Sequence, residues 1–439
     1  MSHDIIGKGA YGKVFAVGDV ATKATRLFLE DGRLSEACVN ELSATALLEI
    51  HKLPRVHIAA KVADDGVDVH FKMHRGIQSM EKYVIDTPRA DRMASYRTVL
   101  VGLVSELSRL HAVGMAHGDM KPANIIFVNR GSSKHIRLID FGTACMYRRG
   151  KPWTTDDHFV VTTHQFAAPE QFDGACPEPA TDAYSLGTVL LYYVCQQYLF
   201  PPCDDPEEDP FDVQDAVHAM YQRDTGTHAI SRRIDELLEG CCVPAPDASI
   251  IRRLLDPDPK ARMSVRKLHR LMNPLMPLPR SRRDTIIRAP SGKATWSGRA
   301  DAFRYIAKLL QPRVDSLALA CNMADRFVAA TGGNDDMTHD VFDACAAISA
   351  CLVRHYEGFE SDRNDLPFRS ATARVISSLD HRLLSWTAYD HLVEAGHMHA
   401  DCDMMLAALV ATNTAKAAAA WYIREQPTRT RRRIKICRR

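Results

Sequence analysis

The sequence predicts an α+β domain over residues 1–273 and an all-α domain over residues 298–420. Three observations lead to this fold class. Roughly the first 70 residues have the pattern of short strands separated by turn glycines, interrupted by one helical pattern at about residues 34–53. The pattern then turns mostly helical, and after Arg299 strand signals are almost absent. Between the two regions, at residues 274–297, prolines and arginines replace the apolar periodicity, which indicates a linker.

The composition sets broad limits: 46% of the 439 residues are hydrophobic, 25% are charged, and the net charge is +2. No segment has about 18 uninterrupted apolar residues, so we expect no membrane span. The N-terminus lacks a secretory signal pattern. The twelve cysteines are scattered through apolar stretches, which favours free thiols in an intracellular protein. We therefore expect a nuclear or cytoplasmic location, in the host cell if the chain is viral.

The first motif is a glycine-rich turn of the form GxGxxGxV, made by Gly7, Gly9, Gly12 and Val14. Glycine allows backbone amides to approach phosphate oxygens without interference from a side chain. Glycine-rich hairpins also occur by chance, and dinucleotide-binding folds use a similar spacing. The turn alone therefore predicts a site for phosphates, which fits ATP, but does not identify the protein.

Lys23 follows this turn on the next predicted strand, and Glu41 lies on the amphipathic stretch 34–48. A strand lysine at this distance can reach the α- and β-phosphates of ATP, and a glutamate on the next helix can hold it as an ion pair. A solvated surface contact between the two residues is the alternative.

The decisive segment is His117-Gly118-Asp119-Met120-Lys121-Pro122-Ala123-Asn124, followed by Asp140-Phe141-Gly142. Transfer of a phosphoryl group to a hydroxyl needs a carboxylate beside the attacking oxygen, a cation on the moving phosphate, and metal ligands. Asp119 suits the first role and Lys121 the second. Asn124 and Asp140 supply the oxygen ligands that Mg²⁺ prefers. This spacing is very improbable by chance.

With these motifs, residues 1–272 resemble the eukaryotic protein kinases. Ala168-Pro169-Glu170 is similar to the end of their activation segment, residues 182–187 to the buried helix that follows, and Arg262 to the arginine that pairs with this glutamate. The resemblance implies a bilobal fold with a small β-rich N-lobe and a helical C-lobe. Lys121, in its DxKPxN context, resembles the Ser/Thr type, which implies protein substrates with Ser/Thr acceptors.

Within this superfamily the chain resembles the cyclin-dependent kinases. Residues 20–27 are similar to their VALKKIRL strand, residues 34–43 to their PSTAIREIS helix with one residue inserted, and residues 159–163 to the end of their activation loop. Ala167 stands where these kinases carry an arginine, so a preference for Ser/Thr-Pro sites is left open.

Gly118 stands where the family carries an arginine that grips a phosphate on the activation loop. Asp156 and Asp157 lie near the position of the phosphothreonine. We therefore hypothesise that activation-loop phosphorylation is not required. Thr154 and Thr155 leave the alternative of phosphorylation open.

Helical stripes dominate the region after Arg299, and residues 341–353 are apolar nearly all round, as in the central helix of a bundle. Residues 324–328, 343–357 and 378–392 resemble, in order, three helical segments of a cyclin box. The resemblance implies an activator in the same polypeptide, which would press on the helix at 34–48 and bring Glu41 to Lys23. Pairing between two chains, or binding of another partner, are the alternatives.

The end of the chain, residues 421–439, is predicted to be a basic tail. Its arginines suit a nuclear-import signal, a nucleic-acid arm or a merely solvated end; elsewhere we expect no nucleic-acid binding. For the whole chain, two functions stand against each other: a kinase that carries its own cyclin, and a catalytically silent scaffold or regulator of other kinases.

Overall fold

We describe the protein from a computed structural model. The structure describes residues 4–9, 12–29, 34–50, 56–63, 66–130, 133–148, 151–152, 163–200, 228–272, 296, 298–310, 313–332, 338–352, 365–379, 383, 387, 389, 392, 395, 400–412 and 414–425. The chain forms two compact units. The first comprises Met1–Val17, Thr22–Met73 and Thr285–Arg439, and the second comprises Gly18–Ala21 and His74–Asp284. The predicted C-terminal helical domain thus groups with the N-terminal strands and their helix.

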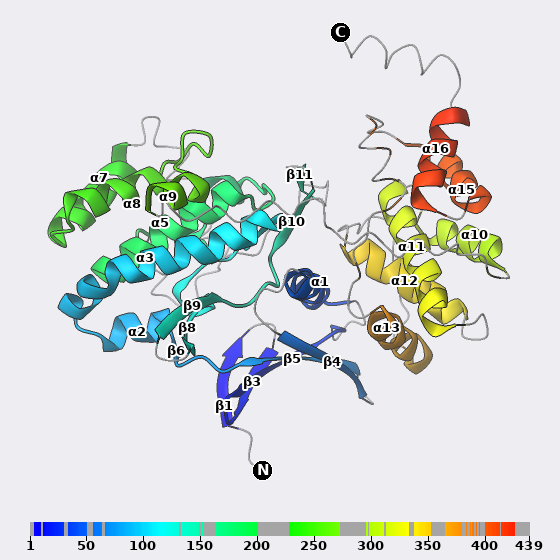
Figure 1. Ribbon diagram of the computed structural model, residues 1–439, viewed down its shortest axis with the longest axis horizontal. Coiled ribbons are helices and arrows are strands. Elements are labelled where there is room, and N and C mark those ends of the chain that lie inside the picture. The colour runs from blue at the N-terminus through cyan, green and yellow to red at the C-terminus, as the bar shows by residue number, and fades with distance from the viewer. Residues whose placement is uncertain are drawn as a thin grey trace, which may run out of the picture. The chain divides into compact units, whose positions relative to one another are not determined.

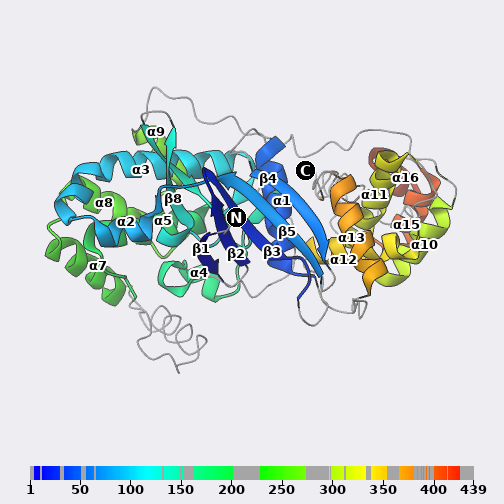
Figure 2. The same ribbon diagram turned by 90° about the horizontal axis from the view of Figure 1, so that it is seen from below.

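The N-terminal part of the chain forms a five-stranded sheet in the order β1-β2-β3-β5-β4 (Figures 1 and 2). β1 pairs with β2, and β4 with β5, in antiparallel hairpins. The strands are β1 (Asp4–Gly9), β2 (Gly12–Val17), β3 (Val20–Arg26), β4 (Val56–Ala63) and β5 (Gly66–His74).

Helix α1 (Glu36–Ile50) accompanies this sheet. It begins after Ser35, whose hydroxyl accepts a hydrogen bond from the amide of Cys38 at 3.3 Å and so caps the helix. Every residue from Cys38 to Leu48 is buried. The prediction of an amphipathic helix is therefore wrong on this point, because α1 contacts β4 on the sheet and also helix α12 of the C-terminal region.

The C-terminal region of the first unit is helical wherever the structure describes it (Figure 1). Helix α12 contacts α10, α11 and α13 as well as α1, and its residues 341–352 are all buried, as the apolar pattern predicted. The helices are α10 (Arg299–Leu310), α11 (Val314–Thr331), α12 (His339–Leu352), α13 (Leu366–Ser378), α15 (Cys402–Ala411) and α16 (Ala415–Glu425).

An ion pair links the start of α10 to the rest of this helical region. The guanidinium of Arg299 donates two hydrogen bonds to Asp325, at 2.7 and 2.8 Å, and two more to the carbonyls of Leu409 and Thr412, both at 2.9 Å. One residue thus connects three helices. Helix α16 continues to Glu425, so the boundary predicted at residue 420 falls too early, because the alanine-rich start of this segment favours helix.

The second unit is mostly helical, as predicted, but it also contains short strands that the sequence reading missed. They form two three-stranded sheets, β6-β8-β9 and β11-β10-β7. Strands of two to six residues are too short to show a clear period. The strands are β6 (Gln78–Ser79), β7 (Met115–Ala116), β8 (Ile125–Arg130), β9 (Ser133–Leu138), β10 (Cys145–Arg148) and β11 (Lys151–Pro152).

The core of the second unit is helix α5, whose residues Thr181 to Cys195 are all buried and which contacts α3, α7, α8 and α9. The helices are α2 (Met80–Asp86), α3 (Arg89–Ala112), α4 (Pro169–Phe172), α5 (Pro179–Cys195), α7 (His228–Gly240), α8 (Ala245–Leu254) and α9 (Val265–Met272).

Two further observations apply to the described part of the chain. None of its helices combines the length and the apolar composition needed to cross a membrane. Its cysteines are free thiols. The predicted linker 274–297 and the basic end of the chain lie almost entirely outside the described residues.

Candidate functional site

The first part of the site is an ion pair in the first unit. Lys23 on β3 lies 2.6 Å from Glu41 on α1, measured from Nζ to Oε2, and only 11% and 5% of the two side chains are exposed. The predicted pair is therefore present, and it is not the solvated surface contact that was the alternative. A buried ion pair is costly to separate, since either charge alone would be left in an apolar environment.

The glycine-rich segment forms the hairpin of β1 and β2, with Gly9 opposite Gly12. A Cβ atom on Gly12 would lie 2.3 Å from the carbonyl oxygen of Ala24 on β3, so no side chain fits there. Gly7 faces Val14 across the hairpin, with an ordinary contact of 3.6 Å for an added Cβ. The glycine at position 12 is thus required by the close approach of β2 to β3. The two residues at the tip of the hairpin lie outside the described residues.

The second part of the site lies in the second unit, around the carboxylate of Asp119. Lys121 Nζ lies 2.8 Å from Oδ2 of Asp119, and the amide of Thr163 donates to Oδ1 at 3.0 Å. Asn124 donates from Nδ2 to the Asp119 carbonyl at 2.9 Å and to Oδ2 at 3.3 Å. Lys121 also donates to the Thr163 hydroxyl at 2.7 Å. The structure therefore brings Asp119, Lys121 and Asn124 together, and it adds Thr163, to which the sequence reading gave no role.

Asp182 on α5 holds the loop that carries this carboxylate. Its oxygens accept hydrogen bonds from the amides of His117 and Gly118, at 2.8 and 3.0 Å, and it pairs with His111 at 2.8 Å. Burial of Asp182 would raise its pKa, but the hydrogen bonds and charges of His111 and His117 outweigh burial and lower the pKa below its usual value. Asp182 therefore acts as a buried anion that fixes the backbone next to Asp119.

A backbone hydrogen bond brings the segment of Asp140 next to Asn124: the amide of Ile139 donates to the Asn124 carbonyl at 3.0 Å. Its φ is +66°, in the left-handed region that few residues other than glycine adopt. Contacts with neighbouring residues stabilise this strained conformation. His117 Nε2 lies 3.0 Å from the carbonyl oxygen of Ile139, and the ring centroids of His117 and Phe141 are 5.3 Å apart.

The donor set at this point fits Mg²⁺. The amide nitrogen of Asn124 donates to Asp119, which leaves its Oδ1 as one oxygen ligand. The carboxylate of Asp140, which follows Ile139 in the chain, can supply the second. Within the described residues, no group of three His, Cys, Asp or Glu side chains is placed to hold a metal. Mg²⁺ commonly takes one or two protein carboxylates and completes its shell with phosphate oxygens and water, so this sparse set is sufficient.

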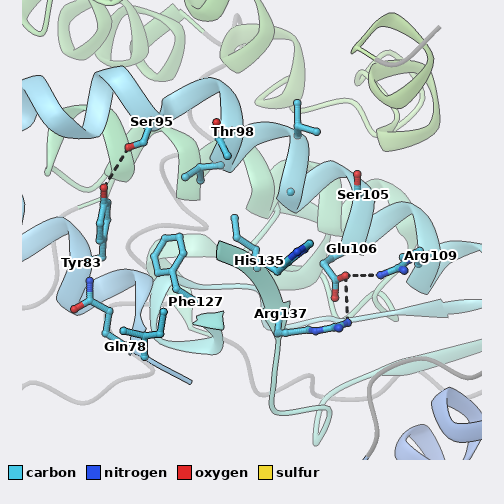
Figure 3. Close-up of a pocket in the computed structure, with 15 residues that line it drawn as sticks. Gln78, Tyr83, Ser95, Thr98, Ser105, Glu106, Arg109, Phe127, His135 and Arg137 are labelled. Atoms are coloured by element: carbon cyan, nitrogen blue, oxygen red, sulfur yellow. Dashed lines mark hydrogen bonds and ion pairs between the residues drawn. The ribbon is translucent and has the colours of Figure 1, made fainter. Parts of the chain in front are cut away.

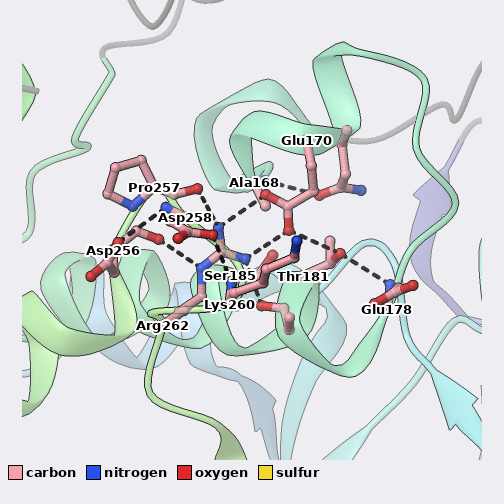
Figure 4. A network of polar contacts seen from close by, with 12 residues as sticks. Ala168, Glu170, Glu178, Thr181, Ser185, Asp256, Pro257, Asp258, Lys260 and Arg262 are labelled. Atoms are coloured by element: carbon pink, nitrogen blue, oxygen red, sulfur yellow. Dashed lines mark hydrogen bonds and ion pairs between the residues drawn. The ribbon is translucent and has the colours of Figure 1, made fainter. Parts of the chain in front are cut away.

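A network around Glu170 anchors the segment that follows (Figure 4). Arg262 donates two parallel hydrogen bonds to this carboxylate, from Nη1 at 2.7 Å and from Nη2 at 2.9 Å, and its side chain is fully buried. The same guanidinium donates to the carbonyls of Ala180, Asp256 and Pro257. The predicted pair of Glu170 and Arg262 is present, and its bidentate geometry makes it strong.

Gly118 occupies a position that excludes a side chain. Its φ is +82°, and an added Cβ would lie 2.6 Å from the carbonyl oxygen of Thr143 and 2.9 Å from Cγ of Pro177. Gln171 also donates to the Gly118 carbonyl at 3.0 Å. The space next to Gly118 is thus filled by the backbone of Thr143 and by Pro177. The activation-loop residues 153–162, which include the aspartates and threonines of our hypothesis, lie outside the described residues.

Comparison with known proteins identifies the family. The protein kinase domain family matches residues 1–272, which is more than half of the chain. The chain belongs to the protein kinase family. The prediction of a Ser/Thr-type kinase domain is confirmed by this match and by the names of the relatives.

Among the relatives of this kinase is the probable serine/threonine-protein kinase PkwA of Thermomonospora curvata, which is 34% identical over 141 residues, 29% of this chain and 18% of its own length. The probable serine/threonine-protein kinase PknB of Corynebacterium glutamicum is 27% identical over 217 residues, 48% of this chain and 32% of its own length. PkaB of Streptomyces coelicolor is 29% identical over 199 residues, 43% of this chain and 46% of its own length. The chain thus spans less than half the length of each of these relatives.

Proposed function

We propose that this chain is an ATP-dependent Ser/Thr protein kinase that its own C-terminal helical domain activates, as a cyclin activates a cyclin-dependent kinase. The catalytic part of the proposal rests on Asp119. Three donors, from Lys121, Asn124 and Thr163, fix its carboxylate, so that it is oriented to accept the proton of an attacking Ser or Thr hydroxyl.

The other site residues have complementary roles in this proposal. Gly7, Gly9, Gly12 and Val14 form the hairpin over the ATP phosphates, and Lys23 binds the α- and β-phosphates. Lys121 neutralises charge on the phosphoryl group during transfer. Asn124 and Asp140 hold Mg²⁺, which when bound neutralises the phosphates of ATP.

The observation that carries the regulatory part of the proposal is the contact between α12 and α1, the helix that bears Glu41. In kinases this glutamate must face the strand lysine for activity. Here the Lys23–Glu41 pair is formed at 2.6 Å while α12 lies against α1. A domain that binds only this position of α1 shifts the population toward the paired state.

A second contact supports the same reading. Phe28 lies two residues after the end of β3, the strand that bears Lys23. Its ring packs edge-on against Phe368 of α13, with centroids 5.8 Å apart and planes at 64°. The Arg369 guanidinium lies 6.0 Å from the Phe28 ring, and α13 also contacts β4. The helical domain therefore contacts α1, which carries Glu41, and also the segment that follows the strand of Lys23.

The contact departs from the pattern that the cyclin resemblance implies. Cyclins bond the kinase helix through a lysine and a glutamate, and the resemblance matches these two residues to His355 and Thr372 of this chain. His355 lies outside the described residues. Thr372 is fully buried and donates to the carbonyl of Phe368 within its own helix at 2.9 Å. The proposed activation therefore relies on apolar packing through Phe368 in place of this polar pair.

The alternative function, a silent scaffold, is separated from the kinase by one assay. The purified full chain is expected to consume ATP and to phosphorylate a Ser/Thr peptide mixture. Asp140→Asn should lower the rate at least about a hundredfold, because the metal loses its carboxylate ligand. Equal, background-level rates for the two proteins would favour the scaffold.

Activation by the helical domain is tested with Phe368→Ala. Removal of the ring weakens the packing of α13 on Phe28 by about 1 kcal/mol. This should lower the fraction of molecules with the Lys23–Glu41 pair formed, and hence kcat, by up to about fivefold. Phe303→Ala is the matched control, since Phe303 is an equally buried phenylalanine of the helical region, on α10. Both variants are assayed at a temperature where circular dichroism shows them folded. Equal kcat values for Phe368→Ala and the control would refute activation through this contact.

A further inference from the structure

A groove runs along helix α3 on the second unit, apart from any of the site residues described above. It has a volume of about 500 Å³, and residues of α3, α2, β6, β8 and β9 line it (Figure 3). On α3, lining residues recur from Ser95 to Arg109. At 1.5 Å per residue this is a length of about 21 Å. The mean cross-section is then about 25 Å², about half of the roughly 48 Å² that one extended chain occupies in packed sheets, so the open groove can take one side of a single extended chain.

The middle of this groove, which we call the α3/β9 groove, is apolar. Val99, Phe127 and Ile136 lie along it, and all three are buried in the fold. Gly102 allows β9 to approach, since a Cβ there would lie 2.9 Å from Cδ1 of Ile136. At the rim, Ile77 is 48% exposed and adds apolar surface to the middle of the groove. Apolar side chains of a ligand would therefore be favoured along the middle.

One end of the α3/β9 groove carries excess positive charge. Glu106 pairs with Arg109 at 2.9 Å and with Arg137 at 3.5 Å, so two guanidiniums face one carboxylate (Figure 3). The side chain of Arg109 is 45% exposed. His135 is a further exposed lining residue of β9. A guanidinium has five N–H donors, so this end retains donors and a net positive charge for an acidic group.

We propose that the α3/β9 groove binds an extended segment of a protein substrate, apolar along its length and acidic at the end that meets Arg109 and Arg137. The proposal rests on the proposed kinase activity toward proteins. Groove length, apolar middle and charged end together define the sequence class: about six residues at 3.3 Å each, with bulky aliphatic side chains followed by aspartate or glutamate. Such a segment holds the substrate near the kinase and raises its local concentration at the catalytic centre.

The test uses the full chain and a defined probe. The probe is a fluorescein-labelled ten-residue peptide with leucines at alternate positions followed by two aspartates, and its partner has two lysines in their place. Fluorescence anisotropy is expected to show saturable binding of the aspartate peptide and at least tenfold weaker binding of the lysine peptide.

Two variants locate the binding. Arg109→Glu reverses the charge at the acidic end, and Thr98→Trp fills the groove from an exposed position on α3. Each should weaken binding of the aspartate peptide at least tenfold. Arg97→Glu is the matched control, because it reverses an exposed charge on the same helix outside the groove, and it should leave binding unchanged.

A kinetic experiment distinguishes failure of the groove proposal from failure of the proposed kinase activity. The aspartate segment fused to an acceptor peptide should lower KM at least tenfold with kcat unchanged, and Arg109→Glu should remove this gain. If no acceptor is phosphorylated, the proposed activity fails while the anisotropy result still stands on its own. Equal binding of both peptides, no binding at millimolar concentration, or insensitivity to both groove variants would overturn the groove proposal.

Discussion

At the scale of single residues, the structure explains why Gly118 stands where other protein kinases carry an arginine. The sequence alone identified the missing arginine. The structure adds that a side chain is excluded, because the backbone has a positive φ and the carbonyl of Thr143 and the ring of Pro177 occupy the space. A phosphate on the activation loop therefore has no arginine to meet at this position, which supports our hypothesis that control has moved elsewhere.

The exclusion at Gly118 is measurable. Gly118→Ala should lower the free energy of unfolding by about 3 kcal/mol or more, since it combines a strained φ with a steric overlap. Gly18→Ala is the matched control: Gly18 also has a positive φ, +56°, but an added Cβ meets no atom within 4 Å. The control should cost only about 1 kcal/mol. Chemical denaturation of the two variants gives the comparison, and equal losses would show that the space beside Gly118 is not closed.

At the scale of elements, the sequence predicted the long helices, which have a clear hydrophobic period, and the residue pairs that belong to motifs. The helix expected at 341–353 is found at His339–Leu352, and the helical pattern at 34–53 becomes α1 at Glu36–Ile50. The pair Lys23–Glu41 followed from the spacing of the motifs, and the pair Glu170–Arg262 followed from the resemblance to the protein kinases.

Other features depend on tertiary contacts that no local pattern encodes. The burial of α1 on every side could not be predicted from its own sequence, because the covering helix α12 lies about 300 residues further along the chain. The α3/β9 groove arises where Gly102 meets Ile136, two residues that are unremarkable in the sequence. Thr163 acquires its contacts with Asp119 and Lys121 only through the path of the chain after the activation loop.

At the scale of the whole molecule, the grouping of the N-terminal strands and α1 with the C-terminal helices favours regulation within one chain. In the sequence, the second unit and the predicted linker 274–297 separate α1 from the C-terminal helices, and this linker directly precedes the helices. A flexible chain of the same length, about 24 residues, has a root-mean-square reach of about 25–30 Å, which would correspond to an effective concentration near millimolar. Even a modest interface, such as one centred on Phe28 and Phe368, would then stay occupied.

The proposed activation within one chain predicts that activity is independent of protein concentration. Specific activity should stay constant when the full chain is diluted from about 1 μM to about 1 nM, because an intramolecular contact at millimolar effective concentration does not dissociate on dilution. Pairing between two chains behaves differently, since a complex with micromolar affinity is almost fully separated at nanomolar concentration. The rate per mole of enzyme, measured with a fixed excess of ATP and acceptor peptide, decides between them. A fall in specific activity over this range would place the activating helices on a second copy of the chain.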